Sequence, residues 1–200
     1  MSPQPEIAPP ALEPPQLPQE FAASERQILL SIARRAIFSA VRGEKPVFAP
    51  PSPHLSRPRG VFTTLHRAGD LRGCVGYVLP IFPLYHAVAE TAVAAATNDL
   101  RFTPVMLHEL PGLQIELSVL SRMQPIDPDR IEIGKHGLVV SFAGHRGLLL
   151  PQVPVERGWD RETFLAQTCC KAGLNPDVWR HGAMVEAFTA EVFGEQSAAN

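Results

Sequence analysis

The sequence predicts an α+β fold in which a mostly antiparallel or mixed sheet is flanked by helices. Apolar residues recur with helical spacing in 24–42, 83–96 and 161–172. Between these stretches lie pairs of short segments in which apolar and polar residues alternate, as in half-buried strands. Turn sequences at 67–70 and 144–147 separate the members of two such pairs by distances that suit antiparallel hairpins. Hairpins interspersed with helices are typical of α+β proteins.

Composition limits the classes of function. The chain has 200 residues, of which 45% are hydrophobic, enough for one sizeable core. A formal net charge of −2 and the absence of any Lys/Arg run give no reason to expect nucleic acid or an acidic membrane as partner. No secretory signal or membrane-spanning apolar run is found, and the three cysteines fit a reducing compartment. We therefore expect a cytoplasmic protein, and no residue spacing predicts a metal or cofactor.

The two ends of the chain differ from its middle. Residues 1–22 contain seven prolines and are expected to form a disordered tail. Residues 23–195 are expected to form a single domain, and 196–200 a flexible tail. The pair Ser24 and Gln27 has the spacing of a capping box and predicts the start of the first helix.

That first helix is expected to end at Gly43 and to carry a solvated charged face. The charged residues assigned to this face are Glu25, Arg34, Arg35 and Arg42. A proline-rich loop at 46–58 follows, and its length is typical of a lid or an edge wrap.

The remaining elements follow from the same patterns. Strands are expected at 60–65, 71–78, 113–121, 138–142 and 148–150. Thr103 and Pro104 predict a short helical turn, Asp160 caps the helix at 161–172, and a further short helix carries Trp179. The last element, 184–193, alternates like one strand that returns to the sheet.

The segment from Leu71 to Gly76 carries the strongest candidate chemistry. Strand alternation places Leu71 and Val75 on the core face, and Arg72, Cys74 and Gly76 on the opposite face. Glycine weakens a strand, and close approach of a ligand or a backbone is a common reason to keep it there. The simplest alternative is a buried cysteine in a tightly packed hairpin.

Several motifs together resemble the AMMECR domain family. They are Leu71-Arg72-Gly73-Cys74-Val75-Gly76, Asp99-Leu100-Arg101-Phe102, Ile115-Glu116-Leu117-Ser118, Gly134-Lys135-His136-Gly137, Arg146-Gly147-Leu148-Leu149-Leu150-Pro151, Gly158-Trp159-Asp160 and Lys171-Ala172-Gly173-Leu174. The likeness covers about residues 24–195. It implies two unequal lobes separated by a cleft, with the larger lobe built from both chain ends. Microbial members are called AmmeMemoRadiSam system protein A, which implies a Memo-like protein and a radical SAM protein as partners.

The resemblance supplies no established reaction, so two functions are carried forward. The first is a binding or scaffold module that acts through a cleft centred on Cys74 and takes a partner, a peptide or a small molecule. The second is a cysteine-dependent enzyme for acyl or similar group transfer, with Cys74 as nucleophile, His136 or His66 as base, and Glu116 orienting the base or accepting a proton. The residues expected to bind a ligand are Arg72, Gly73, Gly76, Asp99 and Arg101.

Each candidate residue also has a purely structural interpretation. Arg72 and Glu116 are able to form a cross-strand ion pair, and Asp99 with Arg101 to brace a helix end. The structural interpretation of His136, which lies between Gly134 and Gly137, is that it simply forms part of a turn. Of the adjacent pair at 169–170, Cys169 is expected in the core. A metal site built on His54, His66, His86 or His136 has the least support, because no two of them have a ligand spacing.

Overall fold

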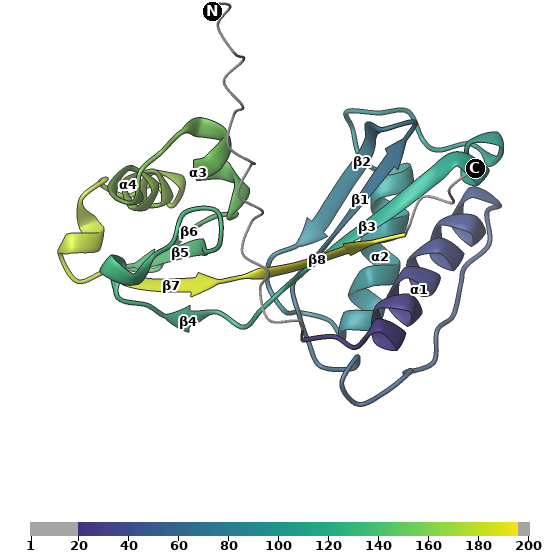
Figure 1. The fold of residues 1–200 in the computed structure, drawn as a ribbon, viewed down its shortest axis with the longest axis horizontal. Helices are drawn as coiled ribbons and strands as arrows, with labels where there is room; N and C mark the ends of the chain where they lie inside the picture. The colour runs from purple at the N-terminus through teal and green to yellow at the C-terminus, as the bar shows by residue number, and fades with distance from the viewer. Residues whose placement is uncertain (1–19, 196–200) are drawn as a thin grey trace, which may run out of the picture.

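The protein has two unequal lobes joined by two crossing segments (Figure 1). The structure is a computed structural model that describes residues 20–195. Within them the α-helices are α1 (Ala23–Val41), α2 (Leu84–Thr97), α3 (Gln152–Arg157) and α4 (Arg161–Lys171), and short 3₁₀ helices span Leu107–Gly112, Pro128–Arg130 and Val178–Arg180. The strands are β1 (Val61–Arg67), β2 (Asp70–Tyr77), β3 (Leu113–Leu120), β4 (Gln124–Pro125), β5 (Gly137–Phe142), β6 (His145–Leu149), β7 (Met184–Phe188) and β8 (Ala190–Gly194). The predicted α+β class is confirmed, and the expected mostly antiparallel or mixed sheet is present as two antiparallel sheets.

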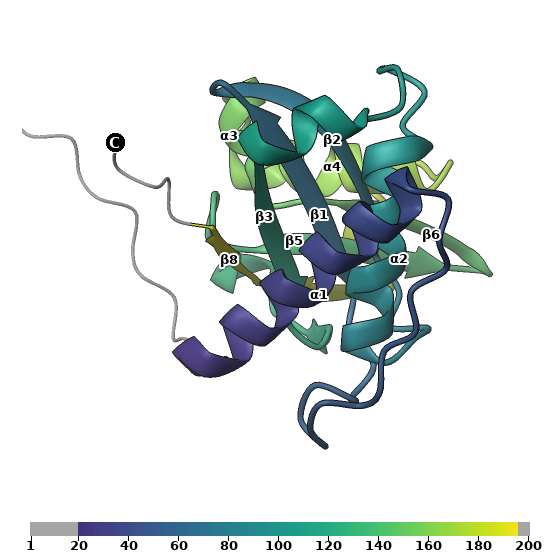
Figure 2. The ribbon, with the colours of Figure 1, turned by 90° about the vertical axis from the view of Figure 1, so that its right-hand side faces the viewer.

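The larger lobe contains the sheet β2-β1-β3-β8 and the helices α1 and α2. Figure 2 shows the two helices side by side on one face of this sheet. That face is apolar because alternate β1 residues, among them Val61 and Leu65, are fully buried against the helices. The implied construction from both chain ends is confirmed, since α1 lies near the start of the domain and β8 at its end.

The smaller lobe contains the sheet β4-β7-β5-β6 with α3 and α4. Its core is formed by fully buried residues of β5 and α4, including Leu138, Phe164 and Leu165. Cys169 belongs to this core, as predicted, whereas the neighbouring Cys170 is exposed. Asp160 caps α4 by accepting a hydrogen bond from the N–H of Thr163 at 2.8 Å.

Two extended segments pass from one lobe to the other. One runs from β3 into β4, and the other from β7 into β8 (Figure 1). The prediction of a single strand over 184–193 is therefore wrong, because the chain leaves one sheet at Phe188 and enters the other at Ala190. No glycine or proline marks the crossing at Phe188, Thr189 and Ala190, so the sequence does not reveal the change of sheet.

Both predicted hairpins are present, and their turns have the same backbone form. Ala68 and Gly69 join β1 to β2 with φ of 52° and 88°, and Ala143 and Gly144 join β5 to β6 with φ of 48° and 83°. Positive φ at both central positions matches the twist of the paired strands. The second turn precedes the one expected at 144–147, and β6 starts at His145.

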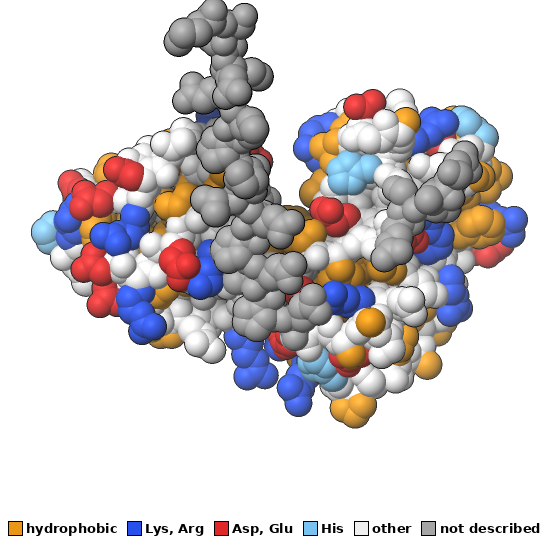
Figure 3. All heavy atoms as spheres, viewed as in Figure 1, with side chains coloured by type: hydrophobic (Ala, Val, Ile, Leu, Met, Phe, Trp, Pro, Cys, Tyr) orange, Lys and Arg blue, Asp and Glu red, His pale blue; other side chains and the backbone are white. Residues whose placement is uncertain are grey.

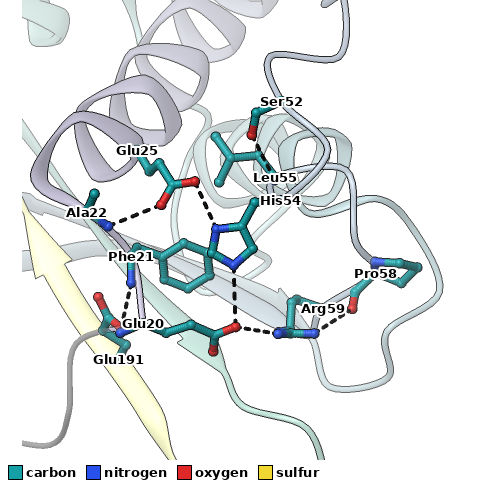
Figure 4. Close-up of polar contacts among 10 residues, drawn as sticks. All are labelled: Glu20, Phe21, Ala22, Glu25, Ser52, His54, Leu55, Pro58, Arg59 and Glu191. Atoms are coloured by element: carbon teal, nitrogen blue, oxygen red, sulfur yellow. Dashed lines mark hydrogen bonds and ion pairs between the residues drawn. The ribbon is translucent and has the colours of Figure 1, made fainter.

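The described chain begins inside the segment expected to be a tail. Phe21 is 3% exposed, and its ring stacks on the ring of His54 with centroids 5.1 Å apart (Figure 4). The backbone N–H of Glu20 donates to Glu191 at 2.6 Å. Ordered packing thus starts at least three residues before the expected boundary at 23, while 1–19 and 196–200 lie outside the described residues.

The start of α1 and the turn after Thr103 also differ from prediction. The helix starts at Ala23, and the Ala22 N–H is bound by Glu25 at 3.1 Å in place of the expected Ser24–Gln27 box. Residues 103–106 are not helical, and the 3₁₀ turn starts at Leu107. The start of a helix depends on which side chain lies close enough to bind the free N–H groups of the first turn. The spacing of residues in the sequence does not show which side chain that is.

The charged residues of α1 do more than face water. Glu25 accepts a hydrogen bond from Nδ1 of His54 at 2.8 Å, which fastens the proline-rich loop to the helix. Arg34 donates from Nε to Glu195 at 2.8 Å and binds two backbone carbonyls near β3. Some of the charged residues that were expected to face solvent therefore contact residues far away in the sequence.

Candidate functional site

The face of the larger sheet opposite its helices carries Cys74. In antiparallel strands, directly paired residues point to the same side. Cys74 pairs with Thr64, and Thr64 in turn pairs with Glu116. Thr63, next to Thr64, is fully buried and bonds Thr91 of α2 at 2.8 Å, so Thr64 and its partners point away from the helices. Cys74, Thr64 and Glu116 therefore form one row across three strands.

This row brings together two of the predicted site residues. Strands lie about 4.8 Å apart, so the backbones at Cys74 and Glu116 are about 10 Å apart with Thr64 between them. The hydroxyl of Thr64 donates to the sulfur of Cys74 at 3.4 Å. All three side chains are partly exposed. We use the name Cys74 face for this row and its neighbours on the same side, Leu71, His66 and Gln114.

Part of the same sheet face is covered by the smaller lobe. Phe62 packs on the cluster formed by Leu120, Val139 and Phe188 at the junction of the lobes. Figure 3 shows the smaller lobe on the left of the view and the larger lobe on the right. The Cys74 row thus lies one row from the interlobe contact, since Phe62 and Thr64 are successive residues on this side of β1.

A bulge in β2 changes the direction of Arg72. Leu65 pairs with Gly73 and His66 with Leu71, so Arg72 is the extra residue in the ladder. The bulge leaves Leu71 on the Cys74 face with 41% of its surface exposed, and the prediction that Leu71 points into the core is wrong. The bulge also removes Arg72 from the face on which it was expected beside the thiol.

Arg72 binds the buried carboxylate of Glu109 instead of Glu116. Its Nε donates at 2.9 Å and its Nη2 at 3.1 Å, and Arg67 adds a third contact at 3.2 Å. These bonds, led by those from Arg72, lower the pKa of Glu109 to about 2 against the effect of burial. Glu109 is 7% exposed and was missed by sequence reasoning. Its only sequence signal is a carboxylate directly before an apolar, proline-containing turn.

Asp99 and Arg101 hold the backbone at Cys74. Asp99 accepts the N–H of Cys74 at 2.8 Å and two guanidinium N–H groups of Arg101 at 2.7 and 3.0 Å. Arg101 also donates to the carbonyl of Cys74 at 3.3 Å. The hydrogen bonds from Arg101 hold the pKa of Asp99 well below its usual range. The structure thus brings both residues to Cys74, where they bind its main chain.

The two glycines of the motif leave room for protein atoms. A Cβ at Gly73 would lie 2.2 Å from the carbonyl oxygen of Ala95, because α2 packs directly on β2 there. A Cβ at Gly76 would lie 2.3 Å from the ring of Phe62. The space beside each glycine is therefore filled by α2 and by Phe62.

The two candidate bases occupy different places. His66 lies on the Cys74 face, one step along β1 from Thr64 on that side. His136 lines a cavity at the lobe junction whose walls do not include Cys74 or Glu116. Its Nδ1 accepts the N–H of Glu132 at 3.0 Å, which leaves the proton of the neutral ring on Nε2. Burial, with a contribution from Lys135, lowers the pKa of His136.

Two further properties of the described residues concern metal binding and membrane crossing. In the described part of the chain, no three His, Cys, Asp or Glu residues gather in an arrangement able to hold a metal ion. Among residues 20–195, no helix has the length and apolar character needed to cross a membrane.

The fold and site define a two-lobed α+β protein with a partly polar sheet face around one cysteine. The chain belongs to the AMMECR1 family, whose pattern matches residues 30–193. It is 46% identical to a protein of Thermococcus gammatolerans in an alignment of 185 positions that covers 85% of this chain and 90% of that protein. A protein of Thermofilum pendens is 41% identical in an alignment of 196 positions that covers 88% of this chain and 92% of the relative.

A solved structure supports the same assignment. The crystal structure of the uncharacterized protein PH0010 from Pyrococcus horikoshii matches with a TM-score of 0.69 and 44% identity. The match covers 84% of this chain and 90% of that one. The similarity thus extends over both lobes.

Proposed function

We propose that this protein is a binding module that recognises its partner through the Cys74 face. The observation that carries the proposal is that Asp99 and Arg101 both form hydrogen bonds with the main chain of Cys74. With Arg72 bound to Glu109, the charged residues nearest the motif are used to fix the strand. A sheet face held in this way is a rigid surface, which suits recognition because little conformational entropy is lost on binding.

The face has a composition suited to a protein or peptide partner. Leu71 is an exposed apolar side chain, and Thr64, His66 and Glu116 supply polar groups around it. An apolar contact surrounded by hydrogen-bonding groups is a common arrangement in interfaces. The family resemblance suggests a Memo-like protein and a radical SAM protein as the partners to test.

Biolayer interferometry with each purified partner tests this function. Glu116→Lys reverses a charge in the Cys74 row and is expected to weaken binding at least tenfold. Glu44→Lys makes the same charge reversal at an exposed position just after α1, and is the matched control. If neither partner binds the wild type, or if both variants bind as the wild type does, the proposal fails.

One observation favours the cysteine-dependent enzyme as a second candidate. His66 shares the Cys74 face, and the diagonal separation of such residues on paired strands is about 7–8 Å, within reach of a histidine side chain. Thr64 already donates to the sulfur, so a reactive thiolate would have one hydrogen bond in place.

Iodoacetamide labelling across pH separates the two candidates. Cys170 is exposed and would also react, so the experiment uses a Cys170→Ser background with Cys74→Ala as the blank. A labelling rate at pH 7 that falls on His66→Ala would support the enzyme. A rate that rises only near the ordinary thiol range, about pH 8.5, and is unaffected by His66→Ala favours the binding module.

A further inference from the structure

The cavity lined by His136 lies at the junction of the lobes, and no residue of the Cys74 face lines it. It has a volume of about 570 Å³ and is lined by residues of both lobes and of the crossing segments. At the crossing, Ser121 and Thr189 are joined by a backbone bond of 2.8 Å and by a bond of 2.9 Å from the Thr189 N–H to the Ser121 hydroxyl. The cavity therefore has a fixed floor, and its volume is in the range that holds small organic ligands.

Cations outnumber carboxylates in the lining. Four basic side chains face two acidic ones. Arg59 is bound to Glu20, and Lys135 is bound to Glu132 at 2.7 Å, so each carboxylate has a cation. Arg122 and Arg130 have no side-chain partner among residues 20–195, and both are exposed. Two positive charges of this cavity are thus not compensated within the described protein.

Arg59, which lines the cavity, carries a buried donor without an acceptor among the described residues. This residue is 7% exposed, and its Nε is buried without a hydrogen-bond partner in the described chain. Its other contacts are to Glu20 and to the carbonyl of Pro58 at 3.5 Å (Figure 4). A buried N–H without an acceptor costs free energy, and that cost falls here on a side chain that lines the cavity.

The geometry points to a binding site for a small organic phosphate in this cavity, with Arg122 and Arg130 as its principal cationic ligands. One guanidinium group binds two phosphate oxygens at once. A phosphate has enough oxygens for two guanidinium groups, whereas a carboxylate has only two oxygens. Pro125 and Ile126 supply an apolar wall for the organic part of the ligand. The concave shape and the overall net charge of −2 favour a small molecule over a nucleic acid strand.

This site gives His136 a role different from a base for Cys74. His136 lines the same cavity, and its Nε2 carries the proton of the neutral ring. It is therefore a hydrogen-bond donor for a phosphate oxygen. The phosphate site and the Cys74 face have no lining residue in common, so the failure of one proposal leaves the other standing.

Isothermal titration calorimetry with three compounds tests the site. Phenyl phosphate carries both a phosphate and an apolar ring, inorganic phosphate lacks the ring, and phenol lacks the charge. We expect phenyl phosphate to bind more tightly than inorganic phosphate, and phenol not to bind. The double variant Arg122→Gln/Arg130→Gln is expected to lose at least tenfold in affinity for phenyl phosphate.

A double variant of equal charge provides the control. Arg35→Gln/Arg42→Gln removes two exposed arginines of the α1 region that do not line the cavity, and its affinity should equal that of the wild type. An equal loss in both double variants would mean a non-specific charge effect and would overturn the proposal. So would the absence of phenyl phosphate binding at millimolar concentration. If a single-stranded oligonucleotide binds more tightly than phenyl phosphate and depends on the same two arginines, the proposal is overturned and the site is a nucleic-acid surface.

Discussion

The carboxylate of Asp99 accepts the backbone N–H of Cys74 at 2.8 Å, although the two residues are 25 positions apart. This bond joins the end of α2 to the middle of β2. Arg101 completes the arrangement by binding both Asp99 and the carbonyl of Cys74. The position of the motif cysteine therefore depends on a segment outside its own hairpin.

Loss of the Asp99 carboxylate should weaken the whole domain. Asp99→Asn removes the charge that binds Arg101 and perturbs the bond to Cys74, in a side chain that is 7% exposed. Hydrogen bonds to charged groups contribute about 1.5–3 kcal/mol each. We expect the free energy of unfolding in urea to fall by about that amount. Asp70→Asn, at an exposed position at the start of β2, is the control and should change it by less than about 0.5 kcal/mol.

The ion pair of Arg72 and Glu109 should make stability depend on acid pH. The pKa of Glu109 is about 2 in the folded state against an ordinary value of 4.5. A lowered pKa stabilises the folded state fully above the unfolded value, and this contribution disappears as pH falls through the folded value. Urea unfolding measured from pH 6 to pH 2 should therefore show a loss on the order of 3 kcal/mol from this group.

The variant Glu109→Gln isolates that contribution. It lacks the titrating carboxylate, so its stability should be lower at pH 6 and should change less than that of the wild type between pH 4.5 and 2. The fall attributable to Asp99, whose pKa is also lowered, remains in both proteins. Parallel curves for the two proteins would show that Glu109 does not stabilise the fold in this way.

Gly73 should not tolerate a side chain. Gly73→Ala places a methyl group 2.2 Å from the carbonyl oxygen of Ala95, and relief requires α2 to move from the sheet. Overpacking of this kind costs about 1–3 kcal/mol. The control is Gly112→Ala, where a Cβ has no atom within 4 Å. Thermal unfolding should show a clear decrease in Tm for the first variant only, and equal Tm values would contradict the close approach of α2.

The start of the domain can be located by truncation. A chain beginning at residue 20 retains Phe21 and the bond from Glu20 to Glu191. A chain beginning at residue 23 loses both, and removal of a buried phenylalanine ring costs about 3–5 kcal/mol. We expect the first protein to unfold in urea as the full chain does and the second to be markedly less stable. Equal stability of the two truncated chains would place the boundary at residue 23.

Periodicity predicted most elements of this fold because each has one apolar face. The hairpin of β1 and β2, the helices α2 and α4, and the strand β3 follow directly from it. The crossing at Thr189 did not follow, because no glycine or proline marks the point at which the hydrogen-bond partner changes. Identity of a partner strand is a tertiary property that a single segment does not encode.

The candidate site was predictable in its centre and less so in its surroundings. Cys74 and Glu116 do share a sheet face, as simple alternation suggested. Arg72 leaves that face because of a one-residue bulge, which depends on pairing with His66 and Leu65. Glu109 was missed because its burial results from two arginines contributed by other elements.

The crossing segments also determine the order in which the lobes are completed during synthesis. The strands and helices of the smaller lobe form one continuous stretch from Gln124 to Phe188, whereas the larger sheet needs β8 from the far end. While the chain is still on the ribosome, β3 has an unpaired edge where β8 will later bind, and such edges invite association with other chains. Pairing of β8 closes that edge, and Glu195 then binds Arg34 of the first helix.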